Sequence, residues 1–174
     1  MAGCERVRVR AESPQDEGAI RRVNELAFGG RGEAALVDAL RKAGAVTLSL
    51  VAEVGGQVAG HVLFTPVAIE WSSGPLLAVG LGPMAVLPAQ QGQGIGTRLV
   101  RAATRELAED GHCAVVVLGH PPYYPRFGFQ PASRFGLRWE HPCPEAAFMA
   151  LELRPGALAG HAGVVRYRPE FSAR

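Results

Sequence analysis

Alternating and periodic apolar positions predict a strand and two helices in the first quarter of the chain. Residues 5–11 alternate between polar and apolar side chains, which is the two-residue period of a half-buried strand. Ser13 and Pro14 then suit the N-cap and the first position of a helix, and apolar residues follow at helical spacing over residues 20–27. A second helical pattern runs over residues 33–44 and ends on a glycine, a common residue at a helix C-terminus.

The middle of the chain is predicted to hold a hairpin and a third, interrupted strand. Residues 48–54 and 58–69 are apolar runs separated by a Gly-Gly pair, which favours an antiparallel hairpin. Residues 76–87 form another apolar run, which two glycines and a proline interrupt at residues 80–83. Because glycine marks bulges and proline cannot donate to a strand ladder, we expect this strand to be kinked or unpaired near its middle.

The remaining pattern completes a mixed sheet. Apolar residues trace one helical face over residues 95–107, and a short buried strand follows at residues 114–118. Residues 121–127 favour a turn or short helix, and residues 137–139 and 148–153 favour two further strands. The order of elements predicts an α/β fold, a mixed sheet with helices on its faces.

Length and charge limit the class of protein. A chain of 174 residues, 48% of them hydrophobic, can form one compact domain with a core but not two, so we expect a single domain over residues 1–174. The formal net charge of +2 comes from 18 basic and 16 acidic side chains without a run of like charges, which argues against nucleic-acid binding. The first ten residues hold three arginines and no apolar stretch, so they do not form a signal peptide. Without a run of about 18 apolar residues no membrane span is expected, and the prediction is a cytoplasmic protein.

Cysteine and histidine spacing indicates neither a disulfide framework nor a metal site. Cys4, Cys113 and Cys143 are odd in number and far apart, so we expect reduced thiols. Four histidines lie at no metal-ligand spacing and are expected to be satisfied or exposed imidazoles: His61, His112, His141 and His161. No metal is expected.

A glycine-rich turn between the third strand and the long helix is the most distinctive motif. Its glycines stand at alternating positions, Gly92, Gly94 and Gly96, and backbone N–H groups at the helix start lack intrahelical partners. These groups and the helix dipole favour an anion, and a diphosphate is the natural occupant. A P-loop would need a lysine before Thr97, so a nucleotide-triphosphate site of that kind is excluded. The dinucleotide fingerprint needs a different glycine spacing, so a dinucleotide site is less favoured. If only the three glycines are considered, a turn that merely connects the strand to the helix stays an alternative.

The residues around this turn resemble those of a known family. Val86-x-Pro88 precedes Gln91-Gly-x-Gly-x-Gly, and Tyr124 stands four residues before a Gly-Phe pair. Together these motifs resemble the acetyl-coenzyme A signature and second landmark of the GNAT superfamily of N-acetyltransferases. The resemblance covers most of the chain. It implies a mostly antiparallel sheet with helices on both faces, and a bulged central strand that splays from its neighbour.

The resemblance also implies where acetyl-coenzyme A binds. The backbone of Met84, Ala85 and Val86 would face the pantetheine arm and the thioester. The pyrophosphate would be wrapped by Gln91, Gly92, Gln93, Gly94, Ile95, Gly96 and Thr97. One departure from the family pattern is His120 with the two prolines after it, where many relatives carry an asparagine that touches the cofactor. The prolines preclude the same contacts, so that one contact is not expected.

The implied reaction is direct attack of an amine on the thioester. The backbone N–H of Val86, freed by the bulge, is the candidate oxyanion donor. Tyr124 is the candidate general acid for the leaving thiolate, and Tyr123 is a weaker rival. The alternative for Tyr124 is a core tyrosine that packs on Phe127 and Phe129.

The general base is not readable from the sequence. Glu33, Asp38, Glu70 and His120 are conceivable, and water could serve instead. Glu33 opens the second helix, near the loop that borders the acceptor site in the family. An acidic residue at a helix N-terminus can also be a simple dipole partner, so both roles stay open for Glu33.

These features predict an enzyme that transfers an acetyl group from acetyl-coenzyme A to an amine, on a small molecule or on a protein. One alternative is a non-catalytic module that binds or senses acyl-coenzyme A on the same fold. A second alternative is a nucleotide-diphosphate binding protein. The apolar strand at residues 148–153 is expected at a sheet edge, where it could pair between subunits in a homodimer.

Overall fold

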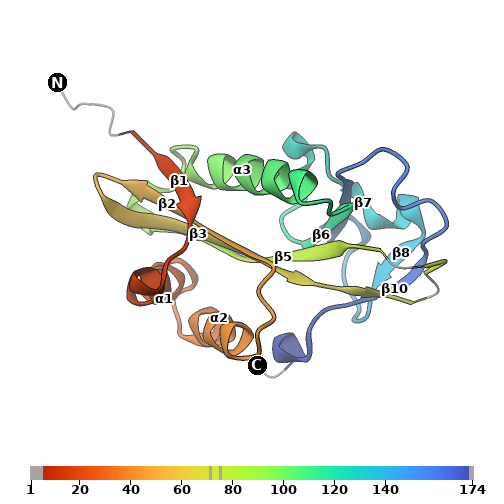
Figure 1. The fold of residues 1–174 in the computed structure, drawn as a ribbon, viewed down its shortest axis with the longest axis horizontal. Helices are drawn as coiled ribbons and strands as arrows, with labels where there is room; N and C mark the ends of the chain where they lie inside the picture. Colours follow the sequence, from red (N-terminus) through yellow and green to blue (C-terminus); the bar gives the residue numbers. More distant parts are fainter. Residues whose placement is uncertain (1–5, 71, 75, 173–174) are drawn as a thin grey trace.

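The computed structural model describes residues 6–70, 72–74 and 76–172. Two residues that entered the sequence-based expectations, Cys4 and Glu5, lie outside these ranges. Across the described residues the chain forms a large sheet, a small sheet and three α-helices, and the helices cover both faces of the large sheet (Figure 1).

The large sheet contains seven strands over the described residues, in the order β1-β2-β3-β5-β6-β9-β7. The strands are β1 (Arg8–Ala11), β2 (Leu48–Val54), β3 (Gln57–Pro66), β5 (Ala78–Val86), β6 (Ala114–Leu118), β9 (Phe148–Glu152) and β7 (Gln130–Pro131). Neighbouring strands are antiparallel except β5 and β6, which run parallel. The expected mixed, mostly antiparallel sheet is confirmed.

The small sheet places β10 (Gly163–Arg166) between β4 (Ala68–Ile69) and β8 (Leu137–Trp139). It corrects one expectation, because the apolar run over residues 58–69 does not form a single strand. β3 ends at Pro66, and β4 pairs with β10 instead. Val67 N still donates to Ala78 O at 3.3 Å, and the chain pairs with β10 from Ala68 onward.

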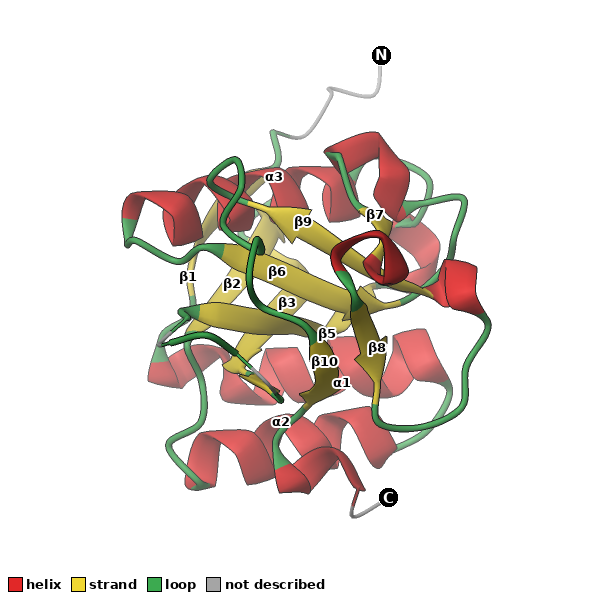
Figure 2. Cartoon of the chain, turned by 90° about the vertical axis from the view of Figure 1, so that its right-hand side faces the viewer, coloured by secondary structure: helices red, strands yellow, loops and turns green. Residues whose placement is uncertain are grey.

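Three α-helices cover the sheet at the expected positions. α1 (Glu17–Phe28) and α2 (Gly32–Lys42) lie on one face, and α3 (Ile95–Glu109) lies on the other (Figures 1 and 2). A 3₁₀ turn leads into α1, and there Ser13 and Asp16 form a reciprocal capping box.

Each helix buries one apolar stripe against the sheet. On α3, Leu99, Val100, Ala103 and Leu107 are at most 1% exposed and pack on the strands at the centre of the sheet. The other face buries Leu40 with its neighbours from α1 and α2. Removing a large apolar side chain from water contributes roughly 1.5–3 kcal/mol. The two packed faces therefore hold β5 and β6 firmly in the centre of the molecule.

β5 parts from its parallel neighbour half-way along its length. It pairs with β6 only from Ala78 to Leu81, opposite residues 114–117. On its other side β5 continues to pair with β3 as far as Val86, with a register shift near its middle. The expected break around residues 80–83 is confirmed, and the second half of β5 has one edge that β6 does not cover.

The position of β9 corrects the expectation of an apolar edge strand. β9 lies between β6 and β7, and its register with β7 is Gln130 opposite Ala150 and Pro131 opposite Met149. Met149 and Ala150 are almost completely buried. The short β7 covers this edge, so pairing of β9 between subunits is not available. A homodimer stays a prediction without a surface assigned to it.

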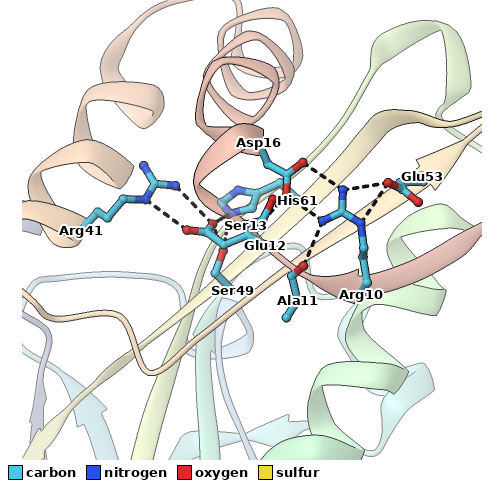
Figure 3. Close-up of polar contacts among 9 residues, drawn as sticks. All are labelled: Arg10, Ala11, Glu12, Ser13, Asp16, Arg41, Ser49, Glu53 and His61. Atoms are coloured by element: carbon cyan, nitrogen blue, oxygen red, sulfur yellow. Dashed lines mark hydrogen bonds and ion pairs between the residues drawn. The ribbon is translucent and has the colours of Figure 1, made fainter.

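A buried polar network joins α1 and α2 to the sheet (Figure 3). His61 on β3 is fully buried, with Nδ1 3.2 Å from Asn24 Nδ2 and Nε2 3.0 Å from Ser49 Oγ. The Ser49 hydroxyl donates to the Glu12 carboxylate, which also accepts from Arg41 Nε at 3.1 Å. His61 is thus a satisfied core histidine, as expected.

The network fixes the charge of its two titratable members. Burial opposes ionisation of Glu12, but hydrogen bonds with His61, Arg41 and Ser49 outweigh it and lower the pKa of Glu12 to about 2. Burial lowers the pKa of His61, and the nearby Glu12 opposes this shift only in part. At neutral pH the network therefore contains a carboxylate, a guanidinium and a neutral imidazole.

Candidate active site

A cavity of about 860 Å³ lies where β5 and β6 part. One half is lined by the second half of β5, the start of α3 and the segment after β6. The other half is lined by the end of α1, the start of α2, residues 139–141 and the C-terminal segment. The cavity therefore runs from the glycine-rich turn, through the gap between the parallel strands, to the face that α1 and α2 cover.

The glycine-rich turn forms one wall of this cavity. Gly92 and Gly94 have φ angles of 75° and 80°, a left-handed conformation that favours glycine. Gly94 is the N-cap of α3, and its carbonyl accepts the first helical bond from Arg98 N at 3.1 Å. The N–H groups of the next residues have no partner within the helix and point toward an anion site at its start.

Gly96 is required for a different reason. A Cβ atom at this position would lie 2.7 Å from the Tyr123 hydroxyl, so the absence of a side chain lets Tyr123 approach the helix start. Arg126 holds Tyr123 on its other side, with Nε donating to the Tyr123 carbonyl at 2.8 Å and the guanidinium 4.4 Å from the ring centroid. Tyr123 thus connects the glycine-rich turn to a cation.

Arg126 is a cavity residue that the sequence interpretation did not single out. Among the described residues that line the cavity, it is the one arginine, and no lysine accompanies it. It lies beside the turn that suits a diphosphate. Only its place in the segment after Tyr124 could have indicated this, because isolated arginines occur throughout the chain.

The register of β5 directs two backbone groups into the gap. Leu87 N donates to Ala59 O at 2.9 Å, and Val86 therefore occupies a position where its own N–H and C=O point away from β3. The Val86 carbonyl accepts from Gln91 Nε2 at 3.0 Å on that side. Met84, two residues earlier, has the same orientation. Both residues line the cavity at the edge that β6 leaves uncovered.

Tyr124 is both packed and at the cavity. Its ring lies against Gly119, where a Cβ atom would collide with it, and makes edge contacts with Tyr123 at 5.1 Å and Phe129 at 5.5 Å between ring centroids. Burial, with a smaller contribution from Tyr123, raises the pKa of the Tyr124 hydroxyl. Packing therefore does not exclude the predicted acid role, because the buried side chain also lines the cavity.

The remaining sequence-predicted residues separate into two groups. Gln91, Gly92, Gly94, Ile95, Gly96 and Thr97 line the cavity, and so do Met84, Val86, Glu33 and His120. Four others do not: Ala85 is buried opposite His61, Gln93 is exposed, Asp38 pairs with Arg21 and Arg41, and Glu70 lies at the small sheet. Of the candidate bases, Glu33 and His120 are thus at the cavity.

The C-terminal segment supplies cavity residues that the sequence interpretation missed. The Tyr167 ring lies directly on Gly80, where a Cβ atom would collide with it, and its hydroxyl donates to Val116 O at 3.3 Å. Phe171 lies 4.0 Å from a Cβ position on Gly82. Gly80 therefore also makes room for a ring from the end of the chain, a second reason for glycine that the strand pattern did not reveal, whereas Gly82 is favoured by its φ angle of 151°.

Three further findings concern metal ligands, cysteines and membrane-spanning helices. Among the described residues, no group of three or more His, Cys, Asp or Glu side chains is arranged to hold a metal ion. Cys113 and Cys143 are free thiols. None of the helices in the described part of the chain is long and apolar enough to cross a bilayer.

A mixed sheet whose parallel pair opens beside a glycine-rich helix start, with a cavity through the opening, defines the acetyltransferase class of α/β folds. Comparison with known proteins agrees. Residues 46–131 match the family model described as acetyltransferase (GNAT) domain. YhbS of Escherichia coli K12, named as an uncharacterized N-acetyltransferase, is 40% identical over 165 residues, which cover 94% of this chain and 98% of YhbS. The chain belongs to the GNAT acetyltransferase family.

Two solved structures extend the likeness to three dimensions. The crystal structure of Escherichia coli YhbS in complex with CoA superposes with a TM-score of 0.92 at 39% identity, over 99% of this chain and 95% of that chain. A GNAT-family acetyltransferase from Brucella melitensis in complex with acetyl-CoA gives a TM-score of 0.79 at 40% identity, over 96% and 99% of the two chains. The expected GNAT fold is confirmed.

Proposed function

We propose that this protein transfers an acetyl group from acetyl-coenzyme A to an amine, by direct attack within a ternary complex. The observation that carries the proposal is the continuous cavity. It joins the start of α3, which suits an anion, to the face of the sheet that α1 and α2 cover, through a gap edged by the backbone of Met84 and Val86. Family membership supports it, as do two relatives that were crystallised with CoA or acetyl-CoA.

The geometry suggests how the cofactor would lie. The diphosphate would accept hydrogen bonds from the N–H groups at the start of α3, and Arg126 would add a charge-assisted contact. The pantetheine arm would run along the free edge of β5 and pair with the backbone of Met84, which leaves the Val86 N–H for the thioester oxygen. This placement brings the thioester to the gap between β5 and β6, beside Tyr124.

The reaction requires one bond to form and one to break. The amine nitrogen, after losing a proton to Glu33 or to water, attacks the thioester carbon, and the Val86 N–H stabilises the oxyanion. The carbon–sulfur bond then breaks, and Tyr124 donates its proton to the leaving thiolate. The acylated nitrogen passes its second proton, through water, to the Tyr124 oxygen, which restores the hydroxyl and leaves a neutral amide. A thiolate that leaves in a buried site is more basic than in water, which offsets the raised pKa of the Tyr124 hydroxyl.

We also propose that residues 1–174 act as one acetyltransferase domain in the cytoplasm. Residues from the first helices to the C-terminal segment line the same cavity, which supports a single functional unit. The free thiols Cys113 and Cys143 are compatible with a reducing compartment. The acceptor amine can belong to a small molecule or to a protein.

Two measurements test the proposed function against its alternatives. Acetyl-coenzyme A should raise the melting temperature while ATP and NAD at the same concentration leave it unchanged, because a nucleotide-diphosphate protein would respond to all three. Release of free thiol should then depend on an added amine, with the acetylated amine detected by mass. Binding of acetyl-coenzyme A with no amine-dependent release across a broad panel would favour the non-catalytic alternative.

A further inference from the structure

The half of the cavity opposite the cofactor side is both aromatic and acidic. It is lined by Phe28, Trp139, Tyr167 and Phe171, together with the carboxylates of Glu33 and Glu140. These residues come from the end of α1, the start of α2, the end of β8 with the loop after it, and the C-terminal segment. Residues far apart in the sequence therefore form one compartment that is lined by aromatic rings and carboxylates.

The rings of this compartment are held in fixed positions. Tyr167 lies on Gly80 and is anchored through its hydroxyl to Val116 O, and it contacts Phe171 with 5.1 Å between ring centroids. Phe171 also packs against the buried apolar residues of α1 and α2. The Trp139 ring makes an edge contact with His141 at 5.0 Å. Such rings offer an apolar wall whose faces also attract cations.

One carboxylate of the compartment is oriented by the backbone. Glu140 Oε1 accepts from Tyr167 N at 3.3 Å, and Arg166 Nη1 lies 3.4 Å from Oε2. The Arg166 side chain is 56% exposed, so solvent screens its charge and the pair is weak. Glu33, half-buried in the first turn of α2, adds a second negative charge to the same cavity.

The two halves of the cavity have opposite charge. The arginine identified above, Arg126, belongs to the cofactor half, where it contacts Tyr123. In the described lining of the opposite half, the charged side chains are the carboxylates of Glu33 and Glu140. An anionic cofactor is thus separated from a compartment that favours a cation and an apolar group.

We infer that the acceptor is a small primary amine with an apolar, aryl or alkyl, substituent, which binds as an ammonium ion. This inference rests on the proposed function and names the substrate class of the same site. The ammonium group would lie between Glu33 and Glu140, and the apolar part would contact Tyr167 and Phe171. The ammonium must then lose one proton before the free amine attacks. The cavity of about 860 Å³ must also hold the pantetheine arm, and this favours a small acceptor.

A competition between amine classes tests the inference. The probes are 2-phenylethylamine, spermidine, and two peptides whose reactive amine is an N-terminus or a lysine side chain. We expect 2-phenylethylamine to have the highest kcat/KM, because it combines a single ammonium group with an apolar ring in a small molecule. A preference for spermidine or for either peptide would overturn the inference while leaving the proposed function intact.

A binding measurement separates recognition from turnover. With the enzyme saturated with CoA, which cannot donate an acetyl group, 2-phenylethylamine should raise the melting temperature, and the neutral analogue 2-phenylethanol should raise it much less. Equal shifts for the two compounds would contradict the role of the carboxylates. Because this measurement needs no catalysis, it tests the inference even if no acetyl transfer is detected.

Substitution of the carboxylates gives the residue-level test. Glu140→Gln keeps an acceptor for the Tyr167 N–H but removes the charge, and we expect the KM for 2-phenylethylamine to rise roughly tenfold while the KM for acetyl-coenzyme A is unchanged. Glu33→Gln should act in the same direction. Glu109→Gln, on the exposed end of α3, is the matched control. An unchanged amine KM in both cavity variants would refute the assignment, and the melting temperature of each variant shows that it is folded.

Discussion

At the scale of single residues, the site depends on three glycines whose missing side chains leave space for tyrosines. Gly96 admits the Tyr123 hydroxyl, Gly119 admits the Tyr124 ring, and Gly80 admits the Tyr167 ring. The sequence could predict the glycine-rich turn and Tyr124, because both belong to motifs with fixed spacing. It could not predict Tyr167 as a cavity residue, because only the folded chain brings the C-terminal segment onto β5.

The acid role of Tyr124 can be tested by removing one oxygen atom. Tyr124→Phe keeps the ring that packs on Gly119, so we expect the affinity for acetyl-coenzyme A to be unchanged and kcat to fall roughly 10²-fold or more. Steady-state rates with detection of free thiol provide the measurement. Tyr123→Phe is the matched control, and a loss of kcat confined to that variant would transfer the role to Tyr123.

The contact at Gly96 makes a second prediction. In Gly96→Ala the new Cβ atom would lie 2.7 Å from the Tyr123 hydroxyl, and Tyr123 is held in place by Arg126 and neighbouring rings. We expect the Kd for acetyl-coenzyme A to rise roughly tenfold, the size of a modest overpacking penalty. The double variant Gly96→Ala/Tyr123→Phe lacks the clashing oxygen. Its Kd for acetyl-coenzyme A should therefore equal that of the single variant Tyr123→Phe. Titration calorimetry would refute this if Gly96→Ala bound as tightly as the parent protein.

At the scale of elements, the sequence pattern predicted local structure better than pairing. It indicated β2, β6 and the three helices, and it placed the break in β5, because glycine and proline act locally. It did not predict which strands pair when they lie far apart in the sequence. The pattern could not show that β3 ends at Pro66 and β4 pairs with β10, or that the two-residue β7 covers β9. It also gave no sign of β10 itself, which is four residues long.

The polar network that joins these elements predicts how stability depends on pH. Burial lowers the folded-state pKa of His61, so below its ordinary value of 6.5 the unfolded chain binds a proton that the folded chain does not. The free energy of unfolding should therefore decrease as pH falls below 6.5. Glu12, with a pKa of about 2, adds stability above its ordinary value of 4.5, and this is lost as pH falls from 4.5 toward 2.

Denaturant unfolding at several pH values measures both effects. His61→Gln should be less stable at pH 7 but should flatten the curve between pH 6.5 and 4.5, because the titrating group is gone. Glu12→Gln should lose the decrease in the free energy of unfolding below pH 4.5. His120→Gln, at an exposed imidazole, is the control. Parent stability that stays constant from pH 7 to 5 would contradict the assigned state of His61.

At the scale of the whole molecule, the fold separates two substrates and brings them together at one gap. The glycine-rich turn and Arg126 line the cavity on the α3 side, and the aromatic, acidic compartment lines it on the side of α1 and α2. Figure 2 shows α3 on one side of the sheet and α1 and α2 on the other. Such a cavity suits simultaneous binding of cofactor and acceptor. It also explains why the C-terminal segment, which lies beneath the sheet near α2 in Figure 1, belongs to the site.

The most direct test of this account is a matrix of initial rates, with acetyl-coenzyme A and the best amine both varied. A ternary complex predicts double-reciprocal lines that intersect, with free thiol and acetylated amine formed in equal amounts. Parallel lines would instead indicate an acetylated enzyme intermediate. That pattern, or thiol release at the same rate without any amine, would contradict direct transfer through the gap between β5 and β6.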